Sequence, residues 1–141
     1  MIVERLTVVN EQMLADINHV NQQLHDDLRK GTLSELRMIV EDKNCAIVVA
    51  KDGEKIVGIA TLYILQKIGT RSAYIEDVVV DSNYRGKGLG EKLVREVIEI
   101  ARAQNVRKLY LTSRQIHTAA HSLYRKVGFK VKETTVFRLG L

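Results

Sequence analysis

The chain contains no proline, no tryptophan and a single cysteine, Cys45. With one cysteine no disulfide can form within the chain, so a fold held together by disulfides is excluded, and Cys45 is expected to be a buried, inert thiol. Aromatic residues make up only 5% of the sequence, which predicts an interior of Val, Ile, Leu and Ala and few surfaces for base stacking. No apolar run is long enough to form a transmembrane helix.

Length and charge limit the organisation and the partners. At 141 residues, with no linker and no repeat, the chain is expected to be a single domain over residues 1–141. Lys and Arg number 22 against 17 Asp and Glu, and the net charge of +5 favours an anionic partner such as a phosphorylated small molecule. The cations are scattered, so no nucleic-acid partner is expected. The N-terminal residues lack a secretory signal, which predicts a cytoplasmic protein with no membrane partner.

The periodicity of apolar residues predicts an α+β fold with a mixed, mostly antiparallel central sheet flanked by helices. Asn10 is a candidate helix N-cap, Thr32 and Glu35 have the spacing of a capping box, and Asp52-Gly53 is a hairpin turn signal. Strands are expected at residues 2–9, 44–50, 56–67, 72–81, 106–114 and 129–141, and helices at residues 10–28, 32–42, 88–104 and 117–127.

A turn dense in glycine, RGKGLG at residues 85–90, joins a β-rich stretch to a helical pattern. Glycine admits a ligand close to the backbone, and the first N–H groups of a helix are unpaired and carry partial positive charge. Because Arg85 and Lys87 add full charges, the turn predicts a bound phosphate or pyrophosphate. The alternative is a flexible strand-to-helix connector.

Two other phosphate-binding motifs do not match this turn. The dinucleotide fingerprint G-x-G-x-x-G needs its third glycine one residue later and an acidic residue about 20 residues further on, where the next strand instead ends YLTSR. A P-loop needs a lysine followed by Ser or Thr after its last glycine, whereas Lys87 precedes Gly88 with no hydroxyl beside it. Both motifs therefore fail on local chemistry.

The pattern that does match is [RQ]-x-x-G-x-[GA], through Arg85, Gly88 and Gly90. Here the sequence resembles the GCN5-related N-acetyltransferase (GNAT) superfamily, whose acetyl-CoA pyrophosphate sits on this turn. A second stretch, AAHSLYRKVGF at residues 119–129, is similar to the family signature A-x-x-L-Y-x-x-x-G-F. The resemblance covers nearly the whole chain and implies the GNAT-like fold of a small, single-domain member.

The resemblance implies a set of contacts to acetyl-CoA. It implies that the strand YIEDVVVD splays from its neighbour at a bulge, which leaves a backbone N–H near Val78 or Val79 for the oxyanion. His117 stands where relatives often carry an asparagine that contacts the pantetheine arm, so its own contact stays open. The implied cofactor-binding residues are Val78, Val79, Val80, Arg85, Gly86, Lys87, Gly88, Leu89, Gly90, Glu91, His117, Tyr124 and Lys126, and no metal is expected.

Two residues are candidates for proton transfer. Tyr124 matches the tyrosine that in many relatives protonates the departing thiolate, and the alternative is that it only packs on its helix. Glu76 is the candidate base, and the alternative is that it only orients the amine or pairs with a surface arginine. Strict alternation would place Glu76 on the face of Val78 and Val80, unless a bulge shifts the register, and Asp77 on the opposite face.

These residues predict an acetyl-CoA-dependent N-acetyltransferase in which a primary amine attacks the thioester directly within a ternary complex. The acceptor is expected to be a small-molecule amine or a peptide or protein amine. The alternative is a noncatalytic module that binds or senses acyl-CoA. The final strand, KETTVFRLGL, could pair with a second subunit, so a homodimer is a further expectation.

Overall fold

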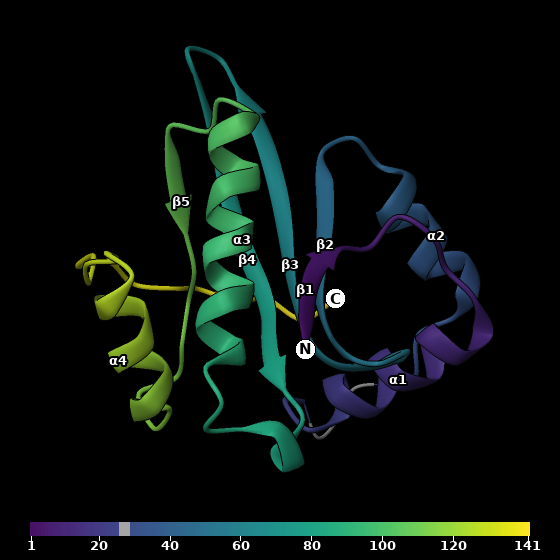
Figure 1. Ribbon diagram of the computed structural model, residues 1–141. Coiled ribbons are helices and arrows are strands. Elements are labelled where there is room, and N and C mark those ends of the chain that lie inside the picture. Colours follow the sequence, from purple (N-terminus) through teal and green to yellow (C-terminus); the bar gives the residue numbers. More distant parts are fainter. Residues whose placement is uncertain (26–28) are drawn as a thin grey trace.

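Over the residues that the structure describes, 1–25 and 29–141, five strands form one mixed sheet (Figure 1). In this computed structural model the strand order is β1-β2-β3-β4-β5, and every neighbouring pair is antiparallel except the parallel pair β4 and β5. The predicted fold class is therefore confirmed. The elements are β1 (Ile2–Arg5), α1 (Glu11–Gln22), α2 (Leu33–Glu41), β2 (Cys45–Asp52), β3 (Lys55–Lys67), β4 (Thr70–Val80), the 3-10 helix η1 (Ser82–Tyr84), α3 (Leu89–Ala103), β5 (Lys108–Tyr110) and α4 (Thr118–Lys126).

Helices cover both faces of the sheet. On one face, Val20 of α1 and Leu36 of α2 are buried against apolar side chains of β2 and β3. On the other face α3, which lies in front of the sheet in Figure 1, buries a stripe at the helical spacing seen in the sequence. This stripe consists of Leu93, Val94, Val97 and Ala101. Among the described residues, no helix is long and apolar enough to cross a membrane.

The local signals at the ends of the elements act as predicted. Asn10 caps α1 by accepting a 2.9 Å hydrogen bond from the Met13 N–H. Thr32 and Glu35 form the reciprocal capping box of α2. Gly53, in the turn between β2 and β3, has a φ of 60°. Residues 26–28, the end of the stretch predicted as the first helix, lie outside the described residues.

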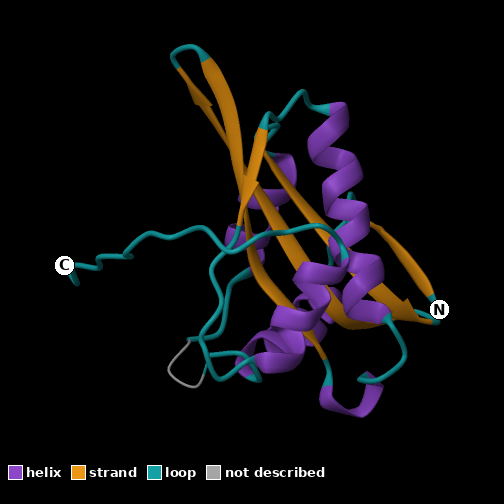
Figure 2. Ribbon diagram, turned by 90° about the vertical axis from the view of Figure 1, so that its left-hand side faces the viewer, coloured by secondary structure: helices purple, strands orange, loops and turns teal. Residues whose placement is uncertain are grey.

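The strand predicted over residues 129–141 is wrong, because this segment forms no regular element. We call residues 130–141 the tail. All of its residues are exposed, and in the described part of the chain no backbone hydrogen bond involves them. Figure 2 shows the tail running away from the sheet to a C-terminus far from the rest of the protein. The sequence does have β character here, but a strand is stable only beside a neighbour.

Candidate cofactor and acceptor site

A cavity of about 490 Å³ opens where the C-terminal part of β4, the N-terminus of α3 and one side of α4 meet. The structure here gathers residues from the two sequence motifs around one space. The expected residues that line it are Val78, Val79, Val80, Arg85, Gly86, Gly88, Leu89, Gly90, Glu91, Tyr124 and Lys126. Five residues outside the expected set line it as well, namely Tyr84, Ala119, Ala120, Ser122 and Leu123.

Two glycines shape the turn that leads into α3. Gly86 and Gly88 have φ values of 79° and 78°, in the left-handed region where a residue with a Cβ is strained. Gly88 is the N-cap of α3, and no side chain caps this helix. The first hydrogen bond within the helix runs from the Lys92 N–H to the Gly88 carbonyl, at 3.2 Å. The N–H groups of the first turn are thus available to an anion at the positive end of the helix dipole.

The side chains of the turn are held in place by neighbouring groups. Arg85 Nε donates to the Val80 carbonyl at 3.0 Å, which ties the turn back to the end of β4. The Tyr84 hydroxyl donates to an Asp52 carboxylate oxygen at 2.9 Å. Lys87 places its Nζ 5.2 Å from the centre of the Tyr84 ring, and it is not among the residues that line the cavity. The turn is therefore anchored by the residues before and between its first two glycines.

Glu91 joins α3 to α4. Its carboxylate accepts from Lys126 Nζ at 3.0 Å and from an Arg95 guanidinium nitrogen at 2.9 Å. These two bonds, the one from Lys126 first, lower the pKa of the Glu91 carboxyl below its ordinary value. Because the carboxylate is already paired, what Glu91 can offer an anion is its backbone N–H.

A bulge interrupts β4 beside the cavity. Ile59 of β3 lies opposite Val79 and Thr61 lies opposite Glu76, so two residues of β4 face one residue of β3. Asp77, within this bulge, has a φ of 56°. The bulge that the family resemblance implied is therefore present.

Around the bulge and after it, one edge of β4 has no strand beside it among the described residues. The short strand β5 pairs only with residues from Ser72 to Tyr74. From Ile75 to Val80 the edge of β4 that faces β5 is left without a neighbour, and its last three residues line the cavity. This edge can therefore accept an extended ligand as an added strand would be accepted.

The bulge also shifts the register of the side chains. Glu76 faces the α1 side of the sheet, as its partner Thr61 does, and shares that side with Val79. Val78 and Val80 instead pack in the cluster under α3. Strict alternation would have placed Glu76 on the same side as Val78 and Val80. The bulge has therefore moved Glu76 to the opposite side of the sheet from these two residues.

Asp77 reaches the same side as Glu76, which corrects the expectation that the two acids point in opposite directions. Its positive φ turns the side chain, and its Oδ1 lies 3.0 Å from His25 Nε2. Partial burial raises the pKa of Glu76, the charge of Asp77 raises it further, and His25 opposes both. The pKa of Tyr63 is raised by burial and then by Asp77. An acidic cluster thus lies on the α1 side of the bulge.

Tyr124 stands on the cavity wall formed by α4. Its ring is half-buried and meets the Phe129 ring edge-on, with centroids 5.9 Å apart. Burial raises the pKa of the Tyr124 hydroxyl above its ordinary value, so this group stays protonated at neutral pH. The position suits a group that donates a proton into the cavity.

His117 and Glu76 lie outside the cavity lining. His117 occupies the N-cap position of α4 without a side-chain capping bond. Glu76 is on the other side of β4 from the cluster under α3, across the bulge. Among the residues that the structure describes, no group of His, Cys, Asp and Glu is arranged to hold a metal ion. Cys45 is buried, and burial raises the pKa of its thiol, as expected for an inert cysteine.

Sequence reasoning missed His25, Tyr63 and Tyr84. No pattern in the sequence could relate His25 to Asp77, since 52 residues separate them. Tyr63 lies in a β-rich run, and nothing in the sequence shows that it comes close to Glu76 and Asp77. Tyr84 directly precedes Arg85 in the glycine turn, so its place in the motif was a usable signal.

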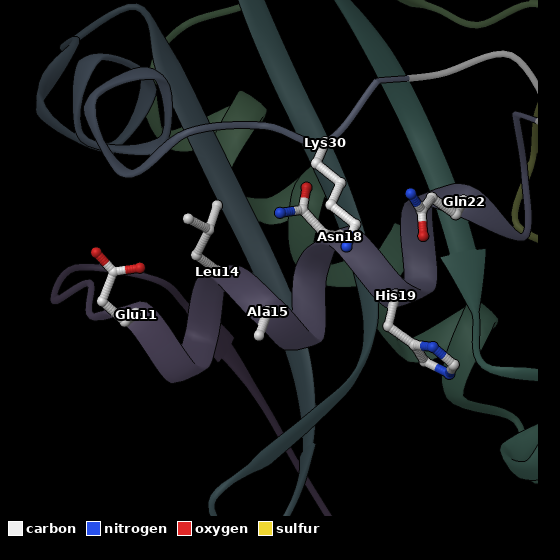
Figure 3. A pocket seen from close by; sticks show the side chains of 7 residues that line it. All are labelled: Glu11, Leu14, Ala15, Asn18, His19, Gln22 and Lys30. Atoms are coloured by element: carbon white, nitrogen blue, oxygen red, sulfur yellow. The ribbon is translucent and has the colours of Figure 1, made fainter.

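A second hollow, of about 340 Å³, lies along the outer side of α1 (Figure 3). Two of its polar side chains, Asn18 and His19, already have partners. The Asn18 side chain bonds both the N–H and the carbonyl of Gly31, at 2.8 and 3.1 Å. His19 Nε2 lies 3.3 Å from a carboxylate oxygen of the buried Asp81, which directly precedes η1 and the glycine turn. His19 of α1 thus contacts the residue from which η1 and the glycine turn begin. The lining residues are Glu11, Leu14, Ala15, Asn18, His19, Gln22 and Lys30.

A mixed sheet whose splayed strand leads into a glycine turn at a helix N-terminus is the arrangement that the family resemblance implied. A sequence model of the acetyltransferase (GNAT) family matches residues 10–129, and the chain belongs to this family. The resemblance noted from the sequence is therefore confirmed.

Known proteins agree with this assignment. A glucosamine 6-phosphate N-acetyltransferase of Trypanosoma brucei brucei is 40% identical over 82 residues, which are 56% of this chain and 54% of that protein. The N-alpha-acetyltransferase RimI of Mycobacterium tuberculosis is 36% identical over 81 residues, 57% of this chain and 49% of the relative. A crystal structure of a Trypanosoma brucei acetyltransferase superposes with a TM-score of 0.77 at 31% identity, covering 99% of each chain. The chain spans about half the length of these two curated relatives.

Proposed function

We propose that this chain is an N-acetyltransferase that moves the acetyl group of acetyl-CoA to a primary amine by direct attack in a ternary complex. The observation that carries the proposal is the convergence of three features on one cavity. These are the free N–H groups at the start of α3, the unpaired edge of β4 and the Tyr124 side chain. The diphosphate, the amide-bearing arm and the thioester of coenzyme A could each meet one of them.

The donor substrate suits the chemistry of the cavity walls. A diphosphate would accept hydrogen bonds from the backbone N–H groups between Gly86 and Glu91, with the guanidinium of Arg85 beside them. The amides of the pantetheine arm would pair with backbone groups of Val78 and Val80 on the open edge of β4. Lys87 and Lys126 are close enough to the turn to add positive charge for the adenosine-side phosphates.

In the proposed reaction a neutral amine attacks the carbonyl carbon of the thioester. A C–N bond forms, the C–S bond breaks, and charge develops on the carbonyl oxygen near the backbone N–H of Val78 or Val79. Loss of one such donor costs about 2.7–4 kcal/mol of barrier in a well-studied enzyme. Tyr124 gives its proton to the departing thiolate, and Glu76 takes the proton of the amine through water. The raised pKa of Glu76 makes it a stronger base than an ordinary glutamate.

The acceptor in this proposal is a primary amine of a small molecule, peptide or protein. Glu76 and Asp77 place two carboxylates on the acceptor side of the bulge, where an ammonium group would be attracted. The two relatives carry names with different acceptors, a sugar phosphate and an N-alpha amine. We therefore propose only that the acceptor group is a primary amine, and the rest of the acceptor molecule must be identified by experiment.

A panel of amines incubated with acetyl-CoA tests the proposal. Release of free coenzyme A thiol should depend on the amine, and the product should gain one acetyl group by mass spectrometry. Calorimetry should detect binding of acetyl-CoA to ligand-free protein. Tight binding without any amine-dependent thiol release would favour the noncatalytic acyl-CoA module instead, and absence of binding would overturn both.

Two further expectations belong to this proposal, a cytoplasmic location and a homodimer. The free thiol of Cys45 is compatible with a reducing compartment, and cell fractionation with an antibody would test the location. The homodimer is supported by the exposed tail, whose β-branched and aromatic residues suit pairing with a second copy, and light scattering on the full chain would test it.

A further inference from the structure

Three of the five tyrosines of this chain form a row across the sheet, on the face that carries Glu76. Tyr63 of β3 pairs directly with Tyr74 of β4, and Tyr74 pairs directly with Tyr110 of β5. Directly paired residues of neighbouring strands project from the same face of a sheet. Glu76 follows Tyr74 by two residues, before the bulge, and therefore projects from this face as well. We call Tyr63, Tyr74 and Tyr110 the tyrosine row.

The acids of the bulge lie on one side of this row. Burial raises the pKa of Tyr63 most, and the charges of Asp77 and Glu76 add to it, so both carboxylates are close to the Tyr63 ring. No lysine or arginine of the described residues forms an ion pair with Glu76. Lys108 precedes Tyr110 by two residues in the parallel strand β5, and it therefore lies on the opposite side of the row from Glu76. One side of the row is thus acidic.

A cation lies on the outer end of the row. Tyr74 and Tyr110 stack with their ring centres 5.4 Å apart, and Lys132 places its Nζ 5.0 Å from the Tyr110 ring centre. The face of an aromatic ring carries negative charge density that attracts a cation. Lys132 is exposed and belongs to the tail, which forms no regular element, so the cation of a ligand can take its place. The Tyr110 ring is therefore a position that accepts an ammonium group.

The distance between Glu76 and this cation position limits the ligand. Residues two apart on a strand are separated by about 6.7 Å and neighbouring strands by about 4.8 Å, which puts the backbone positions of Glu76 and Tyr110 about 8 Å apart. A phosphate along this span would meet a carboxylate at one end and the negative faces of aromatic rings beyond it. An ammonium group would be attracted at both ends. The surface therefore suits a chain with a cation at each end.

We infer that the acceptor is an extended amine that carries a second positive charge, a diamine or polyamine, and that it lies along the tyrosine row. Its reacting amine lies at Glu76, its methylene chain packs on Tyr74, and its second ammonium group replaces Lys132 on the Tyr110 ring. The inference rests on the proposed acetyl transfer and narrows its acceptor. A phosphorylated amine is then a poor acceptor, although the net charge of +5 taken alone favours one.

Matched pairs of amines test the charge of the acceptor. Octylamine and octamethylenediamine have the same chain and differ in the second ammonium group, whereas glucosamine and glucosamine 6-phosphate differ in the phosphate. With saturating acetyl-CoA, kcat/KM per amine group should be at least about tenfold higher for the diamine than for octylamine. It should be lower for the phosphorylated sugar than for glucosamine. A diamine used no better than octylamine, or a preference for the phosphorylated sugar, would overturn the inference and leave acetyl transfer in place.

Variants of the row test where the second cation lies. Tyr110→Leu removes the ring face and should raise KM for octamethylenediamine about three- to tenfold with little change in kcat. Tyr110→Phe keeps the ring face and should behave like the wild-type chain. Lys132→Ala removes the competing cation and should lower the same KM, while KM for octylamine stays unchanged in all three variants. Equal effects of Tyr110→Leu and Tyr110→Phe, or a KM that Lys132→Ala does not lower, would contradict this placement of the ligand.

A binding measurement on the wild-type chain distinguishes this inference from the proposed acetyl transfer. In the presence of coenzyme A, calorimetry should show tighter binding of octamethylenediamine than of octylamine, and the diamine should shift the NMR signals of the Tyr110 ring. Such binding without any release of thiol from acetyl-CoA would contradict acetyl transfer and leave the diamine site standing. Thiol release with other amines, but no preferential binding of the diamine, would contradict the inference alone. Because no variant is needed, a substitution that prevents folding does not affect this result.

Discussion

Two segments of this protein, residues 45–101 and residues 102–141, differ in how much of their apolar surface is buried. The first segment contains β2, β3, β4 and α3, and supplies most of the buried apolar side chains. The second contains β5, α4 and the tail, and supplies none. Yet one wall of the cavity between β4, α3 and α4, including Tyr124, belongs to the second. The first segment thus supplies most of the hydrophobic core, and the second supplies part of the cavity wall without a core of its own.

The difference teaches how the two segments respond to change. A close-packed core is sensitive to the loss of even a few methyl groups. A segment held by its edges, by a bound ligand or by a partner depends instead on a few specific contacts, such as the Lys126–Glu91 ion pair between α4 and α3. Substitutions in the first segment should therefore reduce stability, and substitutions in the second should reduce function.

The largest effect is expected at Tyr124, in the weakly packed segment. Tyr124→Phe removes only the hydroxyl, and the loss of proton donation should lower kcat by about 10²–10⁴-fold while the affinity for acetyl-CoA changes little. Steady-state kinetics and calorimetry on the same preparation measure the two quantities. Phe129→Leu, which alters the neighbouring ring but no proton donor, is the control. A kcat that survives Tyr124→Phe would mean that Tyr124 only packs.

Leu93 should show the opposite behaviour, in the close-packed segment. Its side chain belongs to α3 and is fully buried against the sheet, and Leu93→Ala should lower the free energy of unfolding by about 2–5 kcal/mol. Leu139→Ala, in the exposed tail, is the matched substitution and should cost far less within a single copy. Urea denaturation at low protein concentration, where a dimer would dissociate, compares them. Equal losses would contradict the division into two segments.

Gly88 belongs to the close-packed segment, but it lines the cavity. Gly88→Ala forces a Cβ into the left-handed region, which costs about 1–2 kcal/mol, and should weaken acetyl-CoA binding by roughly tenfold because the turn must change shape. Gly140→Ala, at an exposed position with no positive φ, is the control. Calorimetric titration with coenzyme A measures both. Unchanged affinity in Gly88→Ala would argue against the turn as the diphosphate site.

The smallest effect is a shift in the pH profile. If Glu76 is the base, it must be deprotonated, and its raised pKa means that activity is lost on acidification at a higher pH than for an ordinary glutamate. Asp77→Asn removes a charge that raises this pKa, so the acidic limb of kcat/KM should move to lower pH. His25→Asn removes a group that lowers it, so the limb should move to higher pH.

Each of these two shifts should be a few tenths of a unit to about one unit. A pH-rate series on the wild-type chain and both variants measures them. Shifts in the same direction, or a limb that neither variant moves, would mean that Glu76 orients the acceptor and is not the base. Glu76→Gln should then retain most of its activity.

Much of the fold could be predicted because its signals are local. The capping box of Thr32 and Glu35, the turn at Gly53 and the apolar stripe of α3 depend on residues a few positions apart. The prediction of a final strand was wrong because strand formation depends on a contact with residues distant in the sequence. Residues 129–141 have β character, but a strand forms only when a distant edge receives it, and no local pattern shows where that edge lies.

The sequence by itself determined the family and the glycine turn before α3, because glycine spacing and the motif around Tyr124 act through backbone geometry over short distances. Only the tertiary structure decided where the acids of β4 point. One extra residue in β4 and a positive φ at Asp77 bring two acids to the same face and set Asp77 beside His25. Such a cluster depends on which strands and helices pack together, and packing is a property of the folded chain as a whole.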